Sequence, residues 1–379
     1  MIDVIIPVYK GLTQTRRCLD SVLRCVEVTP FEIVAVDDAS PDVDITRYLD
    51  ALASEGRITL VRNGSNLGFV QSVNRGMALH ADRDVVLLNS DTEVANDWLD
   101  RLRRAANAYP DIGTVTPFSN NATICSYPFE GWTGGVPGTL GLAALDRLFA
   151  SANAGCTVDL PTAVGFCMCI RRACLDQVGL FDAQRFGRGY GEENDFCLRA
   201  AGAGWRNVLA GDVFVYHEGA VSFSGERLAR TMNAGKMLMN LHPDYLRKVR
   251  AYVQHDPAGT LRAAVDSARI AQEEGELRQV LDERIEERAL MKARLTEAEI
   301  YADEREPLIT KLRQGLALAE TLIAERDAEI ARLRAGLSHA EFLAFERARE
   351  LAELQKSWLW KCRIYLMRRK ARRATPPPA

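Results

Sequence analysis

Short apolar runs alternate with helix-like segments over the first 120 residues of the chain. The apolar runs are Val4–Val8, Phe31–Val36, Ile58–Val61 and Val85–Leu88. They are rich in β-branched residues and lack strict alternation, which is typical of strands buried on both faces. Segments with helical spacing, Thr15–Arg24 and Val70–Leu79, lie between them. This order predicts an α/β fold with a parallel, doubly wound sheet.

The next part of the chain is less regular. Residues 119–160 are rich in Gly, Pro, Ser and Asn, and we expect a long irregular segment there. Beyond it the pattern predicts a strand over Val164–Arg171, a Gly-rich loop over Phe181–Gly191, a helix over Asp195–Gly202 and a short strand over Val213–His217.

The character of the chain changes near residue 260, after which Ala, Leu, Glu and Arg dominate. Leu316, Ile323, Ile330 and Leu337 recur every seven residues. Ala319 and Leu333 fall at the second seam position, whereas Arg326 breaks it. Heptad spacing predicts a left-handed coiled coil, which would make the chain a homo-oligomer. The alternative is a single amphipathic helix folded onto the globular part, and in either case we expect Pro307 to break or kink the helix.

The C-terminal tail combines aromatic and basic residues. Trp358 and Trp360 precede seven Lys or Arg residues, with no acid among them: Lys361, Arg363, Arg368, Arg369, Lys370, Arg372 and Arg373. Such a tail is interpreted either as an interfacial helix on an anionic membrane or as a solvated helix end. Pro376–Pro378 predict a disordered tip. We therefore divide the chain into a globular domain over 1–258, a helical or coiled-coil stalk over 259–355 and a basic aromatic tail over 356–379.

Composition narrows the class of protein. The chain has 379 residues, 47% of them hydrophobic and 26% charged, which is typical of a globular protein. A net charge of −3 gives no field that would select nucleic acid as a partner. The nine Cys show no paired CxxC spacing, so we expect reduced thiols and no zinc site. The N-terminus lacks the basic region of a signal peptide, and no apolar run has membrane-spanning length. These features predict a cytoplasmic protein, with the inner face of the membrane as its contact if the tail binds lipid.

Candidate chemistry lies directly after three predicted strands. The segments are Pro7-Val8-Tyr9, Asp37-Asp38 and Asn89-Ser90-Asp91. In an open α/β sheet, ligands bind at the carboxyl ends of strands, so the three segments should converge on one edge. A single Asp after a strand is often only a helix cap or turn former, and that alternative applies to each cluster alone.

The order of the motifs identifies the chain as similar to a known family. The motifs are IIPVYKG (5–11), VAVDDAS (34–40), RNGSNLGFVQSVNRGM (62–77), LLNSDTEV (87–94), GFCMCIRR (165–172), FDAQRFGRGYGEENDFCLRAAGAGW (181–205) and VYHEGAVSF (215–223). Together, over about residues 1–225, they resemble family 2 glycosyltransferases with the GT-A fold. The resemblance implies a doubly wound, mixed, Rossmann-like sheet in residues 1–258, followed by the helical region.

The resemblance also implies which residues bind the donor. A nucleotide-sugar of UDP or dTDP type would lie against Pro7, Val8, Tyr9, Asp37, Asp38, Asn66, Gly68, Phe69, Asn74, Asn89 and Ser90. A divalent cation, Mn²⁺ or Mg²⁺, would bridge the diphosphate to oxygen ligands, with Asp91 as the carboxylate. Asn89 replaces the first Asp of the usual DxD motif, so we expect it to support the site by hydrogen bonding. His217 would add a nitrogen ligand, more natural for Mn²⁺; the alternative is a structural histidine at a strand end.

Three acids, Glu192, Glu193 and Asp195, stand where a loop becomes a helix. A carboxylate within hydrogen-bond reach of the acceptor hydroxyl can act as general base. Alignment with the family motif favours Glu193, with Glu in place of the usual Asp, and Asp195 second. The alternative is that these acids cap the helix and stabilise its first turn.

The resulting functional hypothesis is an inverting, metal-dependent transfer of sugar to a hydroxyl of a glycan or lipid-linked acceptor; inversion is implied by the resemblance alone. Two other classes stay open from the residues. In one, the chain is a non-catalytic coiled-coil assembly protein with an inactive glycosyltransferase-like domain. In the other it is a nucleotidyltransferase, which would need a Gly-rich basic loop, whereas residues 7–17 contain one Gly.

Overall fold

The computed structural model describes residues 1–219, 226–272, 274–300, 306–356 and 358–373. It contains two compact units, Met1–Glu287 and Arg288–Ala379. The first unit therefore continues well past residue 258, where the composition changes. The boundary of the catalytic domain itself at 258 stays a prediction.

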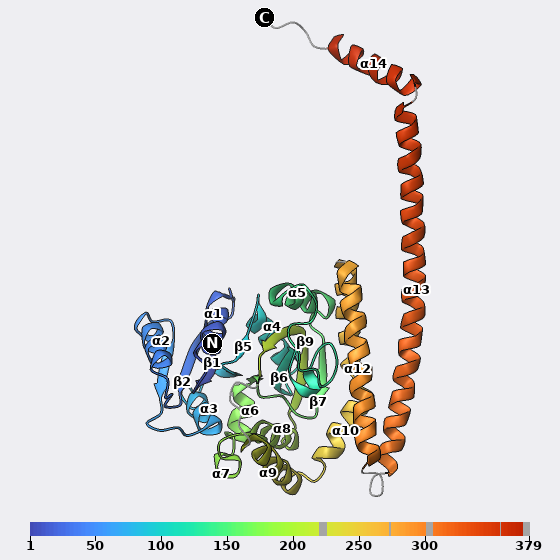
Figure 1. The fold of residues 1–379 in the computed structure, drawn as a ribbon. Helices are drawn as coiled ribbons and strands as arrows, with labels where there is room; N and C mark the ends of the chain where they lie inside the picture. The colour runs from blue at the N-terminus through green and yellow to red at the C-terminus, as the bar shows by residue number, and fades with distance from the viewer. Residues whose placement is uncertain (220–225, 273, 301–305, 357, 374–379) are drawn as a thin grey trace, which may run out of the picture. The chain divides into compact units, whose positions relative to one another are not determined.

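The described part of the first unit is built on a nine-stranded sheet with the order β3-β2-β1-β4-β8-β6-β9-β5, and β7 pairs with β9 (Figure 1). The strands are β1 (Ile2–Val8), β2 (Phe31–Asp37), β3 (Thr59–Arg62), β4 (Asp84–Leu88), β5 (Thr92–Glu93), β6 (Ile112–Ser119), β7 (Thr157–Leu160), β8 (Cys167–Ile170) and β9 (Arg206–His217). The first four strands in this order are parallel, as expected. Beyond β4 the sheet is mixed, because β8 runs antiparallel to both β4 and β6.

Helices cover both faces of this sheet, as in a doubly wound fold. On one face the core includes side chains of α1 (Leu12–Arg24), α2 (Val43–Ser54), α4 (Trp98–Ala106), α5 (Leu142–Ala152) and α11 (Gly259–Gln272). On the other face it includes side chains of α3 (Phe69–Met77), α6 (Arg172–Val178), α7 (Ala183–Phe186), α8 (Glu192–Gly202) and α9 (Glu226–Leu241). In β1, Val4 and Ile6 join the first core and Ile5 the second, since successive side chains point to opposite faces.

The expectation of an irregular segment over 119–160 is wrong for its second half. That half contains α5 and β7, while the first half keeps a single 3₁₀ turn, Thr123–Cys125. Leu145, Leu148 and Phe149 of α5 are buried and form the apolar face of a helix. The Gly- and Pro-rich residues before α5 obscured this helical spacing. The expected loop at 181–191 likewise includes the short helix α7, and the last strand begins at Arg206 rather than Val213.

The helix α11 is part of the first unit. Its Val265 is fully buried in the core beside α5, and Arg262, Asp266 and Arg269 are buried with it. The preceding helix is α10 (Tyr245–His255). Sequence reasoning assigned α11 to a stalk because its composition resembles that of the later helices, but the buried polar side chains distinguish it.

The second unit is helical. It includes the end of α12 (Glu274–Ile300), α13 (Glu306–Lys356) and α14 (Trp358–Arg373). Pro307 is the second residue of α13, in the first turn, where the absence of an N–H is tolerated. Leu316, Ile323 and Ile330 are partly buried and Leu333 is exposed, whereas the side chain of Leu337 lies outside the described part. Pairing of α13 with a second chain stays a prediction.

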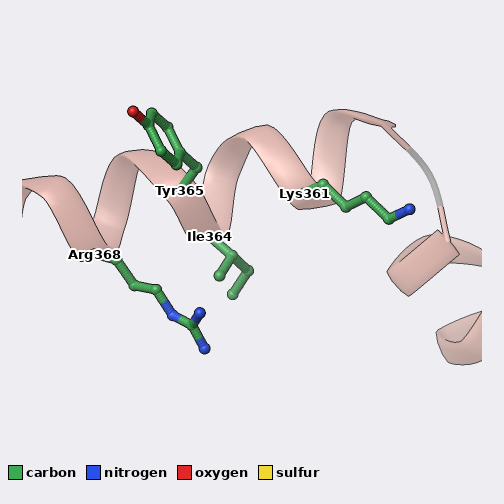
Figure 2. Close-up of a pocket in the computed structure, with 4 residues that line it drawn as sticks. All are labelled: Lys361, Ile364, Tyr365 and Arg368. Carbon is green, nitrogen blue, oxygen red and sulfur yellow. The ribbon is translucent and has the colours of Figure 1, made fainter.

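The tail forms α14, whose described face mixes charge and apolar surface. Figure 2 shows Lys361, Ile364 and Arg368 on one side of the helix and Tyr365 on the other, around a shallow hollow. The side chains of Trp358, Trp360 and Arg369–Arg373, as well as Pro376–Pro378, lie outside what the structure describes. Among the described residues, no helix is long and apolar enough to cross a membrane.

All nine cysteines are free thiols, and six of them are buried. Burial raises the pKa of Cys18 and of Cys125 to about 12, which keeps these thiols protonated. The six buried thiols therefore pack as small hydrophobic side chains.

Candidate active site at the carboxyl edge of the sheet

The first two predicted segments meet at the carboxyl ends of β1 and β2. Val8 pairs with Asp37 in the parallel register, and the backbone N–H of Asp38 donates to the carbonyl oxygen of Val8 at 2.8 Å. Pro7 and Tyr9 flank this contact and are partly exposed. The convergence expected from strand order is therefore present.

The two aspartates are buried and shape the loops around them. The Asp37 carboxylate accepts from Ser40 N at 2.8 Å and from Arg62 Nε at 3.1 Å. The Asp38 carboxylate accepts from Asn63 Nδ2 at 2.7 Å and from the backbone N–H groups of Leu67 and Gly68 at 2.7 and 2.8 Å. Asp38 thus holds the loop that leads into α3, and its contact with a donor stays a prediction.

The start of α3 is tied to the Gly-rich loop before α8. Gly68 has φ +88, and a Cβ there would lie 2.8 Å from Arg188 Cα, so only glycine fits. Arg188 also hydrogen-bonds the Asn66 side chain, and its carbonyl accepts from Phe69 N at 3.3 Å. Asn74 uses both ends of its amide on the Phe181 backbone, at 2.8 and 3.1 Å. These contacts hold the Gly-rich loop that precedes α8 against α3.

Strand pairing brings Asp91 and His217 together, although they lie far apart in sequence. β5 pairs antiparallel with β9, with Thr92 opposite His217, and Glu218 N donates to the Asp91 carbonyl at 2.9 Å. His217 Nε2 lies 3.5 Å from Asp91 Oδ1, and both side chains are mostly buried. On the other side of the ring, His217 Nδ1 contacts the Asn121 carbonyl oxygen at 2.7 Å.

The contact with Asn121 fixes the tautomer of His217. A carbonyl oxygen only accepts, so Nδ1 carries the proton, and in the neutral ring Nε2 presents its lone pair toward Asp91. The ring is also stacked on Phe166, with centroids 5.2 Å apart and planes at 18°. Two electron-pair donors therefore face each other at a spacing that a cation can bridge.

Asn89, the residue that stands in the DxD position, contributes differently from the expectation. Its backbone carbonyl accepts from Thr92 Oγ1 at 2.7 Å, which shapes the turn leading to Asp91. Its side-chain Oδ1 is buried and has no hydrogen-bond partner among the described residues. A buried acceptor without a protein partner is rare in native structures and suits a bound ion or water.

These residues fit a divalent cation. A carboxylate oxygen and an imidazole nitrogen, each about 2.1 Å from a metal, can lie 3.5 Å apart, as Asp91 and His217 do. The other ring nitrogen, Nδ1, donates to the Asn121 carbonyl, which is the usual support of a metal-bound histidine. Two protein ligands leave the remaining positions to diphosphate oxygens and water.

A second group of ligand-type side chains, Asp3, Glu32 and His80, lies at the other end of β1. Arg83 Nη1 donates to Asp3 at 2.8 Å and to Glu32 at 2.6 Å. The guanidinium already pairs with both carboxylates, and His80 Nδ1 lies 2.8 Å from Asp3, so this cluster is interpreted as a structural ion network rather than a competing cation site.

The three acids occupy different environments at the start of α8. Glu192 is 4% exposed, and its Oε2 has no hydrogen-bond partner among the described residues. Glu193 is partly exposed and accepts from Asn194 Nδ2 through Oε1 at 3.0 Å. Burial raises the pKa of Glu192 well above its usual range, with repulsion from Glu193 adding to it, and burial also raises the pKa of Glu193. The described side-chain hydrogen bond to Glu193 comes from Asn194 and not from a cation.

Both carboxylate oxygens of Asp195 have protein partners. Its Oδ2 accepts from Arg199 Nε at 2.8 Å and its Oδ1 lies 2.8 Å from His242 Nε2. This arrangement agrees with the alternative in which the acids stabilise the first turn of the helix. His242, which follows α9, was not identified from the sequence, since a lone histidine between helices carries no pattern.

Glu193 and His217 both lie against the segment Gly165–Phe166, just before β8. A Cβ on Gly165 would lie 3.5 Å from Glu193 Cγ, so the backbone there passes close to the acid. The next residue, Phe166, stacks on His217, and its carbonyl accepts from Asn89 N at 2.8 Å. A short backbone segment therefore links the base candidate to the cation-side residues.

The match to a family model agrees with this geometry. Residues 3–179 match the model of glycosyl transferase family 2. This match assigns residues 3–179, a little less than half of the chain, to that family. The expected fold, a GT-A α/β sheet followed by helices, is confirmed.

Curated relatives of the chain are distant. It is 26% identical over 235 residues to the uncharacterized protein y4gI of Sinorhizobium fredii, covering 59% of this chain and 25% of the relative. It is also 26% identical over 209 residues to an N-acetylglucosaminyl-diphospho-decaprenol L-rhamnosyltransferase of Mycobacterium tuberculosis, covering 49% of this chain and 64% of the relative. The chain thus spans a quarter of the first relative and less than two thirds of the second.

Among solved structures, the chain resembles the mannosyltransferase PcManGT of Pyrobaculum calidifontis in complex with GDP-Man and Mn²⁺, with 17% identity, a TM-score of 0.46, and coverage of 84% of this chain and 86% of that one. It also resembles S. aureus TarS 1-349 in complex with UDP, with 16% identity, a TM-score of 0.42, and coverage of 63% and 65%. Likeness at this level carries no argument about ligands.

Proposed function

We propose that this glycosyltransferase moves a sugar from a nucleotide-sugar donor to a hydroxyl of a glycan or lipid-linked acceptor, with inversion at the anomeric carbon. The observation that carries the proposal is the pair Asp91 and His217, 3.5 Å apart, with the imidazole held by Asn121 so that Nε2 faces the carboxylate. This geometry suits a cation-bound diphosphate and serves no packing purpose that an apolar pair would not serve better.

In this proposal Asp91 and His217 hold the divalent cation, with Asn89 Oδ1 available to a metal-bound water. When bound, the cation stabilises the charge on the departing diphosphate. Of the two metals expected, a mixed oxygen and nitrogen ligand set favours Mn²⁺ over Mg²⁺. The donor lies along the segments after β1, β2 and β4, where parallel strands end.

Glu193 is proposed as the general base. Its carboxylate takes the proton from the acceptor hydroxyl, whose oxygen forms a bond to the anomeric carbon as the bond from that carbon to the phosphate oxygen breaks. A raised pKa strengthens the carboxylate as a base, provided that the pH keeps it ionised. Asp195 is proposed to position α8 through Arg199 and His242.

The acceptor is proposed to be a sugar linked to a lipid diphosphate. The mycobacterial relative is named for such an acceptor, a diphospho-decaprenol carrying N-acetylglucosamine. The basic face of α14, with Lys361 and Arg368 beside Ile364, would suit an anionic membrane surface where that substrate resides. A cytoplasmic enzyme at the inner face of the membrane is consistent with these features.

A screen of nucleotide ligands tests the proposal. The thermal unfolding temperature of the full chain is measured with Mn²⁺ and a panel of UDP-, dTDP- and GDP-sugars, followed by assays of Mn²⁺-dependent release of the nucleoside diphosphate. We expect at least one donor to stabilise the chain and to be turned over, and Asp91→Ala to abolish turnover. If no nucleoside diphosphate stabilises the chain, the proposed function fails and the assembly-protein alternative gains support.

A further inference from the structure

The loop from residue 120 to 141, between β6 and α5, contacts the cation-side histidine through two consecutive asparagines. The side chain of Asn120 is almost fully buried, at 1% exposure. Its Oδ1 accepts from the backbone N–H of His217 at 2.8 Å, and its Nδ2 donates to the His217 carbonyl at 2.9 Å. The β6–β9 pairing ends with Ser119 opposite Val215. The Asn120 amide therefore continues the ladder by one step, where no backbone partner remains.

The residue after Asn120 contacts the imidazole ring of His217. Asn121 follows directly, and its carbonyl oxygen holds His217 Nδ1 at 2.7 Å. Gly219, with φ +64, passes so close to this residue that a Cβ would lie 2.1 Å from Asn121 Nδ2. Loss of the Asn120 amide would remove both hydrogen bonds that hold the His217 backbone on the side facing β6.

The loop that carries these asparagines is held from behind by α11. Arg262 is 3% exposed, and it donates to the carbonyl oxygens of Ser126 at 2.9 Å and of Ile124 at 3.0 Å. Tyr127 donates from its hydroxyl to Asp266 at 2.8 Å and accepts from Arg269 at 3.0 Å.

The far part of the loop is held by the beginning of α12. The Glu276 carboxylate accepts from the backbone N–H of Thr139 at 2.7 Å, and it pairs with Arg269 at 2.8 Å. Glu276 and Arg269 are both fully buried. Buried charges that are satisfied by loop groups are costly to move, so these helices fix the loop in one conformation.

We propose that Asn120 is a positioning residue for the cation-binding histidine, and that the segment Gly259–Glu287 supports it by holding the 120–141 loop. This rests on the proposed role of His217 as a metal ligand. A partner that orients a metal-bound histidine typically changes metal affinity about 10- to 100-fold when removed. The segment Gly259–Glu287 lies beyond the residues that match the family model, yet it contributes to the reaction site of this chain.

Asn153 provides a matched control. It is also 1% exposed, and its Nδ2 donates to the carbonyl oxygens of Gly211 and Leu261, each at 3.1 Å. Replacing either asparagine with Ala removes a buried amide that bridges two carbonyls or backbone groups. The two changes should therefore lower stability similarly, but only Asn120 contacts His217. Because Leu261 belongs to α11, the control also reports any effect that loosening this helix alone has on the site.

The test measures Mn²⁺ binding directly in the full chain, by the loss of the electron paramagnetic resonance signal of free Mn²⁺ during titration. We expect Asn120→Ala to weaken Mn²⁺ binding about tenfold or more, and Asn153→Ala to leave it within about twofold. Unfolding temperatures of both variants are recorded in parallel. If Asn120→Ala does not fold, Asn120→Ser is read in the same way.

Two outcomes separate the inference from the function beneath it. Unchanged Mn²⁺ affinity in the Asn120 variant, with weak binding in Asp91→Ala, overturns the positioning role and leaves the metal site intact. Equal binding by the original chain and by Asp91→Ala overturns the metal site itself, and the positioning role falls with it.

The support from α11 is tested with Arg262→Lys, which keeps the charge but cannot reach both carbonyls. The matched control is Arg101→Lys on α4, where an equally buried guanidinium binds Asp146 and touches none of the loop residues named above. We expect Arg262→Lys to weaken Mn²⁺ binding about threefold or more and Arg101→Lys to leave it unchanged. Equal effects in the two variants would show that general loss of stability, and not the loop, lowers affinity.

Discussion

Glu193 and Asp195 lie two residues apart in the first turn of α8, and exchanging each for its amide should give opposite results. Glu193→Gln removes the proposed base and is expected to lower kcat about 10²- to 10⁴-fold. The same change should leave the unfolding temperature unchanged or raise it. The partly exposed carboxylate lies beside Glu192, and partial burial raises its pKa, so its ionised form is less favourable in the folded state at neutral pH.

Asp195→Asn should do the reverse. It weakens two contacts of 2.8 Å, with Arg199 and His242. A hydrogen bond to a charged group contributes about 1.5–3 kcal/mol, but Arg199 is partly exposed, so screening reduces its share. A loss of about 2 kcal/mol corresponds to roughly 4–8 °C in a unit of this size. We expect kcat to stay within about threefold, because this carboxylate is not free to take a proton.

The assay is release of the nucleoside diphosphate at saturating donor and Mn²⁺, with unfolding temperatures measured on the same preparations. The donor is the one that stabilises the chain most in the ligand screen. A fall in kcat of more than 10²-fold in Asp195→Asn, with an unchanged unfolding temperature, would refute this assignment. It would make Asp195 the base and leave Glu193 as the structural acid.

Three further outcomes are expected. The acid limb of the kcat profile should lie above the value of about 4.3 typical of glutamate, since burial raises the pKa of Glu193, and activity should fall as the pH drops through that limb; an acid limb at 4 or below would contradict it. A chain ending at Glu287 should keep the unfolding temperature of the first unit, whereas a chain ending at residue 258 should lose the buried Arg262 and Arg269 clusters and unfold several degrees lower or fail to fold; equal temperatures would show that α11 adds no stability. Light scattering after size exclusion should give a homo-oligomer that becomes monomeric in Ile323→Arg combined with Ile330→Arg, with Leu318→Arg as the exposed control off the heptad seam; a monomer in the original chain would exclude the coiled coil.

Much of the parallel half of the fold could be predicted from the sequence. β1, β2, β3 and β4 are apolar, β-branched runs, each followed by a polar segment, and the register of β1 with β2 brings Val8 beside Asp37 as expected. The pairing of Asp91 with His217 also agreed with the motif order. These features depend on local pattern and on the general rule that ligands bind where parallel strands end.

Other features depend on contacts between distant residues, which leave no local signal. Nothing around Asn120 shows that its amide would complete the β9 ladder, and Arg262 looks like any helical arginine until its two carbonyl partners are seen. The choice between Glu193 and Asp195 was open for the same reason, since His242 reaches Asp195 from a turn 47 residues away. α5 was missed because the Gly- and Pro-rich loop before it dominates the composition of the window.

The irregularity in the middle of β9 has a consequence for how this chain tolerates changes in length. Its pairing with β6 shifts between Ala210 and Phe214, where the extra residues leave the ladder. An insertion or deletion of one residue there could be absorbed without moving the last four residues of the strand. From Phe214 to His217 a change in length is not tolerated, because a register shift of one residue would turn the imidazole to the opposite face of the sheet. Related chains should therefore vary in length before Phe214 and keep it constant after.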